Sequence, residues 1–166
     1  MSSNFQVAFV GIGSNLNNPQ AQVRSAIKAI ANSEDLFLER TSSLYSSPPM
    51  GPPDQPNYVN AVVRVKTSLG SMALLESLQG IEREHGRVRG GMRWGPRILD
   101  LDILLFGTQS TTTEKLQIPH PGMAERPFVV IPLAEIAPDL FLPNGVCVND
   151  LATEMQDQIL SRLEDE

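Results

Sequence analysis

The chain has 166 residues, of which 41% are hydrophobic and 19% are charged, and its formal net charge is −6. This length suits one domain with a complete core and is short for two, so we expect a single domain over residues 1–166. The acidic balance argues against a nucleic-acid partner, which would need a basic surface. Because the chain has one cysteine, Cys147, an internal disulfide and a cysteine-based zinc site are both excluded.

Two further features exclude a membrane partner. No apolar stretch approaches the roughly 18 residues that a membrane-spanning helix needs, and the first residues, MSSNFQVAFVGIGSN, lack the basic region and cleavage pattern of a signal peptide. We therefore expect a cytoplasmic protein, a monomer by default, whose partners are small molecules.

The first half of the chain predicts two strands around a helix. Residues 5–12 form an apolar run that ends in the turn-forming sequence Gly11-Ile12-Gly13-Ser14-Asn15, as a buried strand would. Asn18 and Pro19 suit the start of a helix, and the apolar residues Val23, Ile27 and Ile30 follow at helical spacing. Residues 36–45 predict a second strand, and residues 46–56 a proline-rich loop.

The middle of the chain repeats the pattern of strand, helix and strand. Residues 58–66 alternate as a strand does, with Val59, Ala61, Val63 and Val65 on one face. Residues 71–85 predict a helix that Gly86 ends, and an apolar strand follows an arginine-rich loop. The order strand, helix, strand, strand, helix, strand predicts an α+β fold with a ferredoxin-like βαββαβ core, in which both helices lie on one face of an antiparallel sheet.

The last third predicts additions to this core. Residues 116–118 suit a short strand and residues 128–135 a helical turn. Residues 150–163 predict a terminal helix with Leu151, Met155, Ile159 and Leu163 facing inward. With these elements the fold would have three layers, with helices on both sides of the sheet.

The most informative segment is RVRGGMRWGPRILDLDILLF, residues 87–106. Asp100 and Asp102 stand two residues apart in a buried strand, so their side chains point to the same face, about 6.6–7 Å apart along the strand. Two converging carboxylates repel each other unless cations neutralise them, and Mg²⁺ binds one or two carboxylates together with substrate phosphates. This pattern predicts a magnesium site at Asp100 and Asp102.

Four arginines directly precede the two aspartates and supply the other half of such a site. An arginine binds phosphate oxygens through two parallel hydrogen bonds and stays charged at any useful pH. A loop rich in arginine is usually just a solvated surface, and an isolated Asp-x-Asp is common. Their combination beside a buried strand, where unpaired charge is costly, favours metal-assisted chemistry on a polyphosphate. The four arginines are Arg87, Arg89, Arg93 and Arg97.

Several blocks in the same order resemble one family. The sequences SPPMGPPDQPNYVN, GRVR, RWGPRILDLDILLFG and IPHPGMAERPF are similar to those of the 6-hydroxymethyl-7,8-dihydropterin pyrophosphokinases of folate biosynthesis. The resemblance implies that the terminal pyrophosphate of ATP, the co-substrate, passes to the hydroxymethyl oxygen of the pterin and that AMP is released. It also implies two Mg²⁺ ions at Asp100 and Asp102, of which Asp100 also approaches the pterin.

The resemblance also implies the other site residues. The catalytic set comprises Arg87, Arg97, Asp100 and Asp102. The ATP-binding set comprises Leu75, Gln79, Glu82, Arg89, Trp94, Arg97, Ile103, Lys115, His120 and Arg126, with Arg93 as an additional member. The pterin-binding set comprises Ser47, Pro48, Met50, Tyr58, Asn60, Trp94, Asp100 and Phe128. The chemistry agrees, because a flat heterocycle favours aromatic stacking and an amide that both donates and accepts.

Two alternatives stay open at this point. A nucleotidyltransferase could place metal-binding aspartates on a similar sheet, and it would release free pyrophosphate. A noncatalytic nucleotide-binding module would bind ATP without turnover. Neither alternative needs a pterin pocket, so the loop at residues 46–56 with Tyr58 and Asn60 favours the pyrophosphokinase.

Overall fold

The computed structural model describes residues 5–15, 18–47, 57–85, 99–155 and 161–163. The predicted order of the core elements is confirmed, with boundaries that differ by a few residues. The core elements are β1 (Gln6–Ser14), α1 (Pro19–Ala31), β2 (Leu36–Thr41), β3 (Tyr45–Ser47), β4 (Tyr58–Thr67), α2 (Ser71–Glu84) and β5 (Asp100–Phe106). Among the described residues, no helix is long and apolar enough to span a bilayer.

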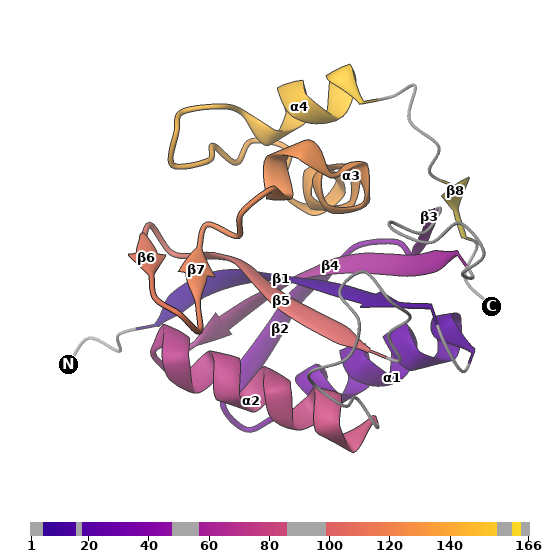
Figure 1. The fold of residues 1–166 in the computed structure, drawn as a ribbon, viewed down its shortest axis with the longest axis vertical. Helices are drawn as coiled ribbons and strands as arrows, with labels where there is room; N and C mark the ends of the chain where they lie inside the picture. Colours follow the sequence, from indigo (N-terminus) through magenta and orange to yellow (C-terminus); the bar gives the residue numbers. More distant parts are fainter. Residues whose placement is uncertain (1–4, 16–17, 48–56, 86–98, 156–160, 164–166) are drawn as a thin grey trace.

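Together with β8 (Ser161–Arg162), the core strands form one antiparallel sheet with the order β5-β1-β4-β3-β8, and β2 also pairs with β4. The strands β1 and β4, which correspond to the first and third strands of the predicted βαββαβ core, are therefore central, and β5 lies at an edge. Both α1 and α2 cover one face of the sheet, whereas α3 (Pro127–Ile136) and α4 (Val148–Glu154) lie over the other (Figure 1). The predicted ferredoxin-like core and its three layers are confirmed.

Each face of the sheet has its own apolar core. Val10, Val63 and Leu101 belong to the cluster that includes residues of α1 and α2, and Phe9, Val62 and Leu105 belong to the cluster that includes α3. Because alternate residues of a strand point to opposite faces, both faces of β1 and β4 are apolar where helices cover them. This explains why Val62, on the face opposite Val63, is also fully buried.

The strand predicted over residues 36–45 is wrong as a single element. It divides into β2 and β3. Thr41 lies opposite Val63 of β4, and Tyr45, four residues later, lies opposite Asn60, which is only three residues away from Val63. One residue of this stretch is therefore extra, as in a β-bulge. Ser42 Oγ accepts the backbone N–H of Val62 at 2.9 Å, so a side chain takes the place of a ladder carbonyl.

The helix predicted over residues 150–163 is also wrong in its second half. The helix α4 ends at Glu154, Met155 is its C-cap, and residues 161–162 form the short strand β8 (Ser161–Arg162). Ile159 lies outside the described residues. The N–H of Leu163 donates to the carbonyl of Leu44 at 2.7 Å, so pairing with a distant strand overrides the local helical spacing.

The hairpin beside β5 consists of β6 (Thr111–Thr112), which the sequence did not predict, and β7 (Gln117–Ile118), which confirms the predicted strand at residues 116–118. The short 3-10 helix η1 (Met123–Glu125) then leads into α3, whose range confirms the helical turn predicted at residues 128–135.

Candidate functional site

The two aspartates of β5 lie opposite glycines of β1. Asp100 pairs with Gly13 and Asp102 with Gly11, and both carboxylates are only partly exposed. Leu101 and Ile103 point to the opposite face and are buried in the core under α1 and α2. The predicted placement of both carboxylates on one face of a strand is therefore confirmed, and the Asn60 amide and the Leu104 side chain lie next to the two glycines.

A pocket of about 340 Å³ opens along the free edge of β5. Its walls come from three elements, namely β5 itself, α2 and the β6–β7 hairpin with the residues that follow. The structure thus brings together seven of the predicted site residues. They are Leu75, Gln79, Asp100, Asp102, Ile103, Lys115 and His120.

Sequence reasoning predicted only Lys115 from the wall that the β6–β7 hairpin forms. Thr113, Glu114, Leu116 and Gln117 also line the pocket, because the β6–β7 hairpin folds back toward α2. The hairpin is fixed at its turn, where the N–H of Thr113 donates to the carbonyl of Leu116 at 2.9 Å. The run of three threonines at residues 111–113, a residue type that favours strands, was the available signal, and it is weak.

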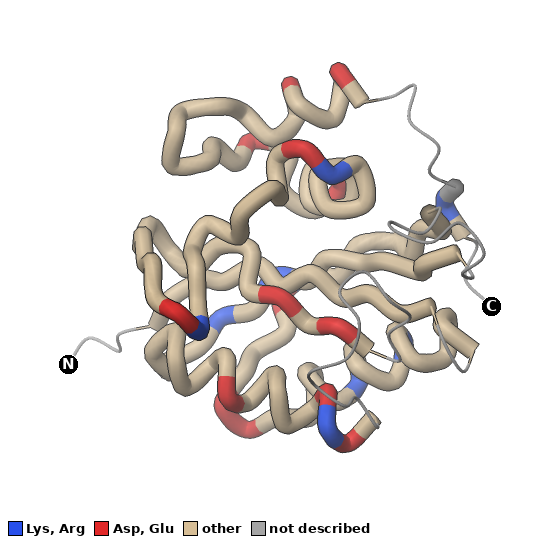
Figure 2. The backbone as a smooth tube through the Cα atoms, viewed as in Figure 1, with Lys and Arg blue, Asp and Glu red and all other residues tan. Residues whose placement is uncertain are grey.

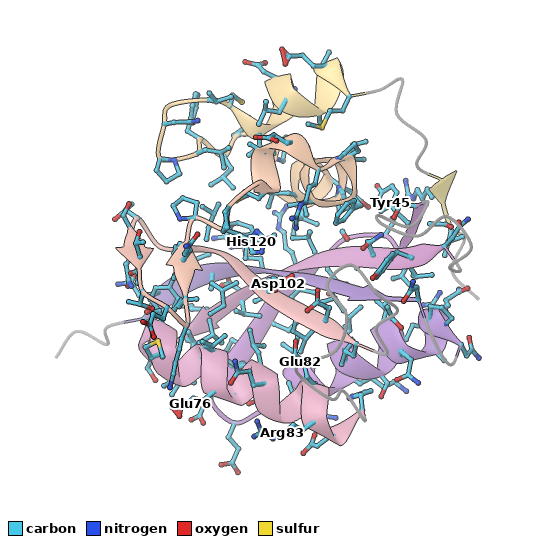
Figure 3. All side chains as sticks on the ribbon, viewed as in Figure 1. Tyr45, Glu76, Glu82, Arg83, Asp102 and His120 are labelled. Carbon is cyan, nitrogen blue, oxygen red and sulfur yellow. The ribbon has the colours of Figure 1, made fainter. Side chains whose placement is uncertain are left out.

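His120 and Asp102 both line the pocket (Figure 3). Its backbone N–H donates to the carbonyl of Leu104 at 3.0 Å, and its buried Nδ1 has no hydrogen-bond partner among the described residues. Burial lowers the pKa of His120, and the charge of Arg126 lowers it further, against the opposing effects of the Pro121 backbone and Asp100. A neutral imidazole with one ring nitrogen unpaired among the described residues therefore lies at the pocket, near the cation Arg126 and the carboxylate of Asp100.

Arg126 and Phe128 lie at the start of α3. The guanidinium carbon of Arg126 is 5.9 Å from the centroid of the Phe128 ring, which is within the range of a cation–π contact. The charge of Arg126 also lowers the pKa of His120. The structure therefore places the predicted residues Arg126, Phe128 and His120 near one another.

The predicted pterin residues of β3 and β4 lie on the same face of the sheet as the aspartates. Asn60 is opposite Gly13 on β4, and Gly13 is opposite Asp100 on the other side. Asn60 and Ser47 are almost fully buried, and Asn60 Nδ2 donates to Ser47 Oγ at 2.7 Å. Tyr58 pairs with Ser47, so these side chains form one group next to Asp100.

Glu82 is placed differently from the other predicted ATP residues. It is 1% exposed and is not among the residues that line the pocket. Its Oε2 accepts the backbone N–H of Leu101 at 2.8 Å. Glu82 therefore joins α2 to the residue between the two aspartates, a contact that the sequence did not indicate.

Seven predicted residues lie outside the described part of the chain. They are Pro48, Met50, Arg87, Arg89, Arg93, Trp94 and Arg97. Within the described ranges, no group of three or more acidic, histidine or cysteine side chains could hold a metal ion, so a cation at β5 would depend on the two aspartates. Figure 2 shows acidic positions along β5, where the two carboxylates lie.

The paired carboxylates beside a polar pocket on a ferredoxin-like sheet favour an enzyme of phosphate transfer. The family model of 7,8-dihydro-6-hydroxymethylpterin-pyrophosphokinase matches residues 9–138. The chain belongs to this family.

Individual relatives agree with the family match. The chain is 49% identical over 156 residues to the 2-amino-4-hydroxy-6-hydroxymethyldihydropteridine pyrophosphokinase of Haemophilus influenzae, which covers 94% of this chain and 97% of that protein. It is also 49% identical over 140 residues to the Pseudomonas aeruginosa protein of the same name, covering 84% of this chain and 86% of that protein.

A solved structure has the same fold at low identity. The Plasmodium falciparum HPPK-DHPS protein crystallised with pteroate superposes with a TM-score of 0.73 at 14% identity. The match covers 95% of this chain and 44% of that one, so the chain spans less than half of this longer protein. This likeness supports the fold alone.

Proposed function

We propose that this chain transfers the terminal pyrophosphate of ATP to the hydroxymethyl oxygen of 6-hydroxymethyl-7,8-dihydropterin and releases AMP, as a step of folate biosynthesis. The observation that carries the proposal is the position of Asp100. It lines the pocket at the edge of β5 and, through Gly13, stands in one row with Asn60. A nucleotide in the pocket and a pterin over Asn60 would therefore meet at Asp100.

The two aspartates fit a magnesium site. Both are partly exposed on one strand face, and carboxylate oxygens are the ligands that Mg²⁺ prefers. Two Mg²⁺ ions held by Asp100 and Asp102 would supply charge neutralisation for the triphosphate and its leaving group. Because no third acidic side chain joins the pair among the described residues, phosphate oxygens and water would complete the coordination.

The ATP half of the site follows from the pocket walls. Leu75 and Ile103 offer apolar surface to a base, and Gln79 offers an amide. Lys115, His120 and Arg126 offer donors to phosphate oxygens. Arg87, Arg89 and Arg97, with Trp94, would complete this half, and their bidentate hydrogen bonds would stabilise the charge that develops during transfer.

The pterin half follows from the neighbouring strands. Asn60 keeps its carbonyl oxygen Oδ1 directed toward Gly13, while its Nδ2 is held by Ser47. A fixed amide of this kind selects the polar edge of a heterocycle. Tyr58 and Phe128 supply aromatic surface, and Pro48, Met50 and Trp94 are the remaining members of the expected pterin-binding set.

Analysis of the products tests this proposal. The protein is incubated with Mg²⁺, ATP and the hydroxymethyl-dihydropterin, and both the nucleotide and the pterin products are identified. AMP with a pyrophosphorylated pterin supports the proposal, whereas ADP or no pterin-dependent turnover in folded protein rejects it. Free pyrophosphate with an adenylated pterin would indicate a nucleotidyltransferase, and ATP binding without turnover a noncatalytic module.

We also propose that the protein acts as a monomer in the cytoplasm. The absence of a membrane-spanning helix from the described residues and the position of both substrate halves on one chain support this. Light scattering at micromolar concentration measures the mass directly, and a dimer would contradict the proposal.

A further inference from the structure

A carboxylate outside the substrate pockets joins two layers of the protein. Glu135, on α3, accepts three hydrogen bonds from Ser43, which precedes β3, and Tyr45, the first residue of β3. The donors are Ser43 N–H at 2.9 Å, Ser43 Oγ at 2.7 Å and Tyr45 Oη at 2.8 Å. None of these three residues belongs to the substrate site proposed above.

The break between β2 and β3 explains why Glu135 is needed. Ser42 keeps the ladder to β4, with its N–H donating to the carbonyl of Val62 at 2.9 Å and its Oγ accepting the N–H of Val62. The extra residue leaves the Ser43 N–H outside the ladder, and a backbone donor in such a place needs an acceptor. The carboxylate of Glu135 provides this acceptor from another layer.

Tyr45 carries the effect of this contact to the pterin residues. It is 8% exposed and pairs with Asn60, so both side chains lie on the α3 face of the sheet. Two residues later, Ser47 ends β3 and accepts the hydrogen bond from Asn60. The position of β3 therefore fixes both the Ser47 hydroxyl and the direction of the Asn60 amide.

The ionisation states match this role. Burial acts to raise the pKa of Glu135, but the hydrogen bonds from Ser43 and Tyr45, with the charge of Arg162 on β8, outweigh it, so the pKa lies below its ordinary value. Burial and the contact with Glu135 raise the pKa of Tyr45. At neutral pH the carboxylate is thus a charged acceptor and the phenol keeps its proton as a donor.

We infer that Glu135 is a positioning residue for the pterin half of the site, acting through Ser43 and Tyr45 on β3 and from there on Ser47 and Asn60. This inference rests on the proposed function. It assigns to α3 a role that differs from that of its first turn, where Arg126 and Phe128 lie. ATP binding at the far edge of the sheet, along β5, does not depend on it.

The test compares Glu135→Ala with Glu135→Gln by steady-state kinetics and by direct titration of pterin binding. Alanine removes every acceptor, so we expect the KM for the pterin to rise about tenfold, equivalent to about 1.4 kcal/mol, while kcat and the KM for ATP change by less than about twofold. Glutamine keeps one carbonyl oxygen for the Ser43 N–H and Tyr45 hydroxyl, and its amide can donate to Ser43 Oγ. Glu135→Gln should therefore restore most of the pterin affinity.

Glu39→Ala is the matched control. Glu39 lies on β2 and pairs with Arg64 at 2.9 Å on the surface of the same sheet, so this change removes an acid without touching β3. Its pterin KM should stay within about twofold of the wild type. If Glu135→Ala does not fold, Tyr45→Phe removes only the phenol donor and should raise the pterin KM about threefold.

A wild-type pterin KM in Glu135→Ala, or in Tyr45→Phe where the alanine variant does not fold, overturns the inference. An equal loss of ATP and pterin affinity would also overturn it, because that pattern indicates general loosening. Failure of the proposed function is a separate result, since the wild-type protein itself would then show no pterin-dependent formation of AMP.

Discussion

Replacement of Gly13 by alanine tests how closely the two halves of the site are joined. Gly13 lies between Asp100 and Asn60. A Cβ at this position would be 3.1 Å from Oδ1 of Asn60 and 3.8 Å from Cδ1 of Tyr58. The first distance is shorter than an ordinary contact, so the Asn60 amide must move by a few tenths of an ångström.

The magnitude follows from what holds Asn60. Its Nδ2 is bound to Ser47 Oγ at 2.7 Å, and its side chain is buried, so a displaced amide no longer meets a bound pterin correctly. An unsatisfied buried polar contact costs about 1–3 kcal/mol, which is about 5- to 150-fold in the KM for the pterin. Alanine in a strand is favoured over glycine by about 0.5–1 kcal/mol, which offsets the weakened Asn60–Ser47 bond, so the melting temperature should change little.

The assay measures AMP formation while the pterin is varied at saturating MgATP, and then while MgATP is varied at saturating pterin. Gly11→Ala is the control on the same strand face, because its Cβ would be 3.4 Å from the flexible side chain of Leu104, an ordinary contact. We expect an unchanged pterin KM for this variant. A wild-type pterin KM in Gly13→Ala would refute the reasoning, and so would an equal rise in the KM for ATP.

Three other outcomes follow from the site. Asp102→Asn should lower kcat by about 10²- to 10³-fold while the circular dichroism spectrum stays unchanged, because the side chain is partly exposed; loss of folding would contradict a catalytic role. Because burial lowers the pKa of His120 in the free protein and bound phosphates would raise it, ATP binding at about pH 6.5 should take up a proton. Calorimetry in buffers of different ionisation enthalpy measures this uptake, which His120→Asn should abolish. Glu82→Ala leaves the N–H of Leu101 without this acceptor and should destabilise the fold by about 1–3 kcal/mol in urea unfolding, and an unchanged midpoint would refute that role.

The sequence predicts the core fold well because its signals are local. The spacing of Val23, Ile27 and Ile30 specifies the buried face of α1, and the alternation in β4 specifies the face that packs in the same cluster as α1 and α2. The order of elements then leaves one simple antiparallel arrangement. The positions of Asp100 and Asp102 on one face depend only on the two-residue period of a strand, so the sequence predicts them as well.

The parts that the sequence did not predict depend on contacts between distant residues. The break between β2 and β3 depends on Ser42 and on Glu135, which contacts Ser43 across 92 positions of the chain. The strand β8 forms because Arg162 pairs with Tyr45, although the local spacing favours a helix. In the same way, no local pattern shows that Gly13 faces Asn60, or that Glu82 contacts Leu101.

The edge position of β5 explains how one strand can serve two substrates. An exposed strand edge has unpaired backbone groups that would otherwise attract another chain. Here Glu82 accepts the N–H of Leu101, and the N–H of His120 donates to the carbonyl of Leu104, so α2 and the residues after β7 cover the edge at two points. Between these points Ile103 lines the pocket, and we expect its backbone to be the edge position open to a nucleotide base. The same strand directs Asp100 and Asp102 to the face shared with Asn60, so the two substrates would approach each other from the edge and the face of a single strand.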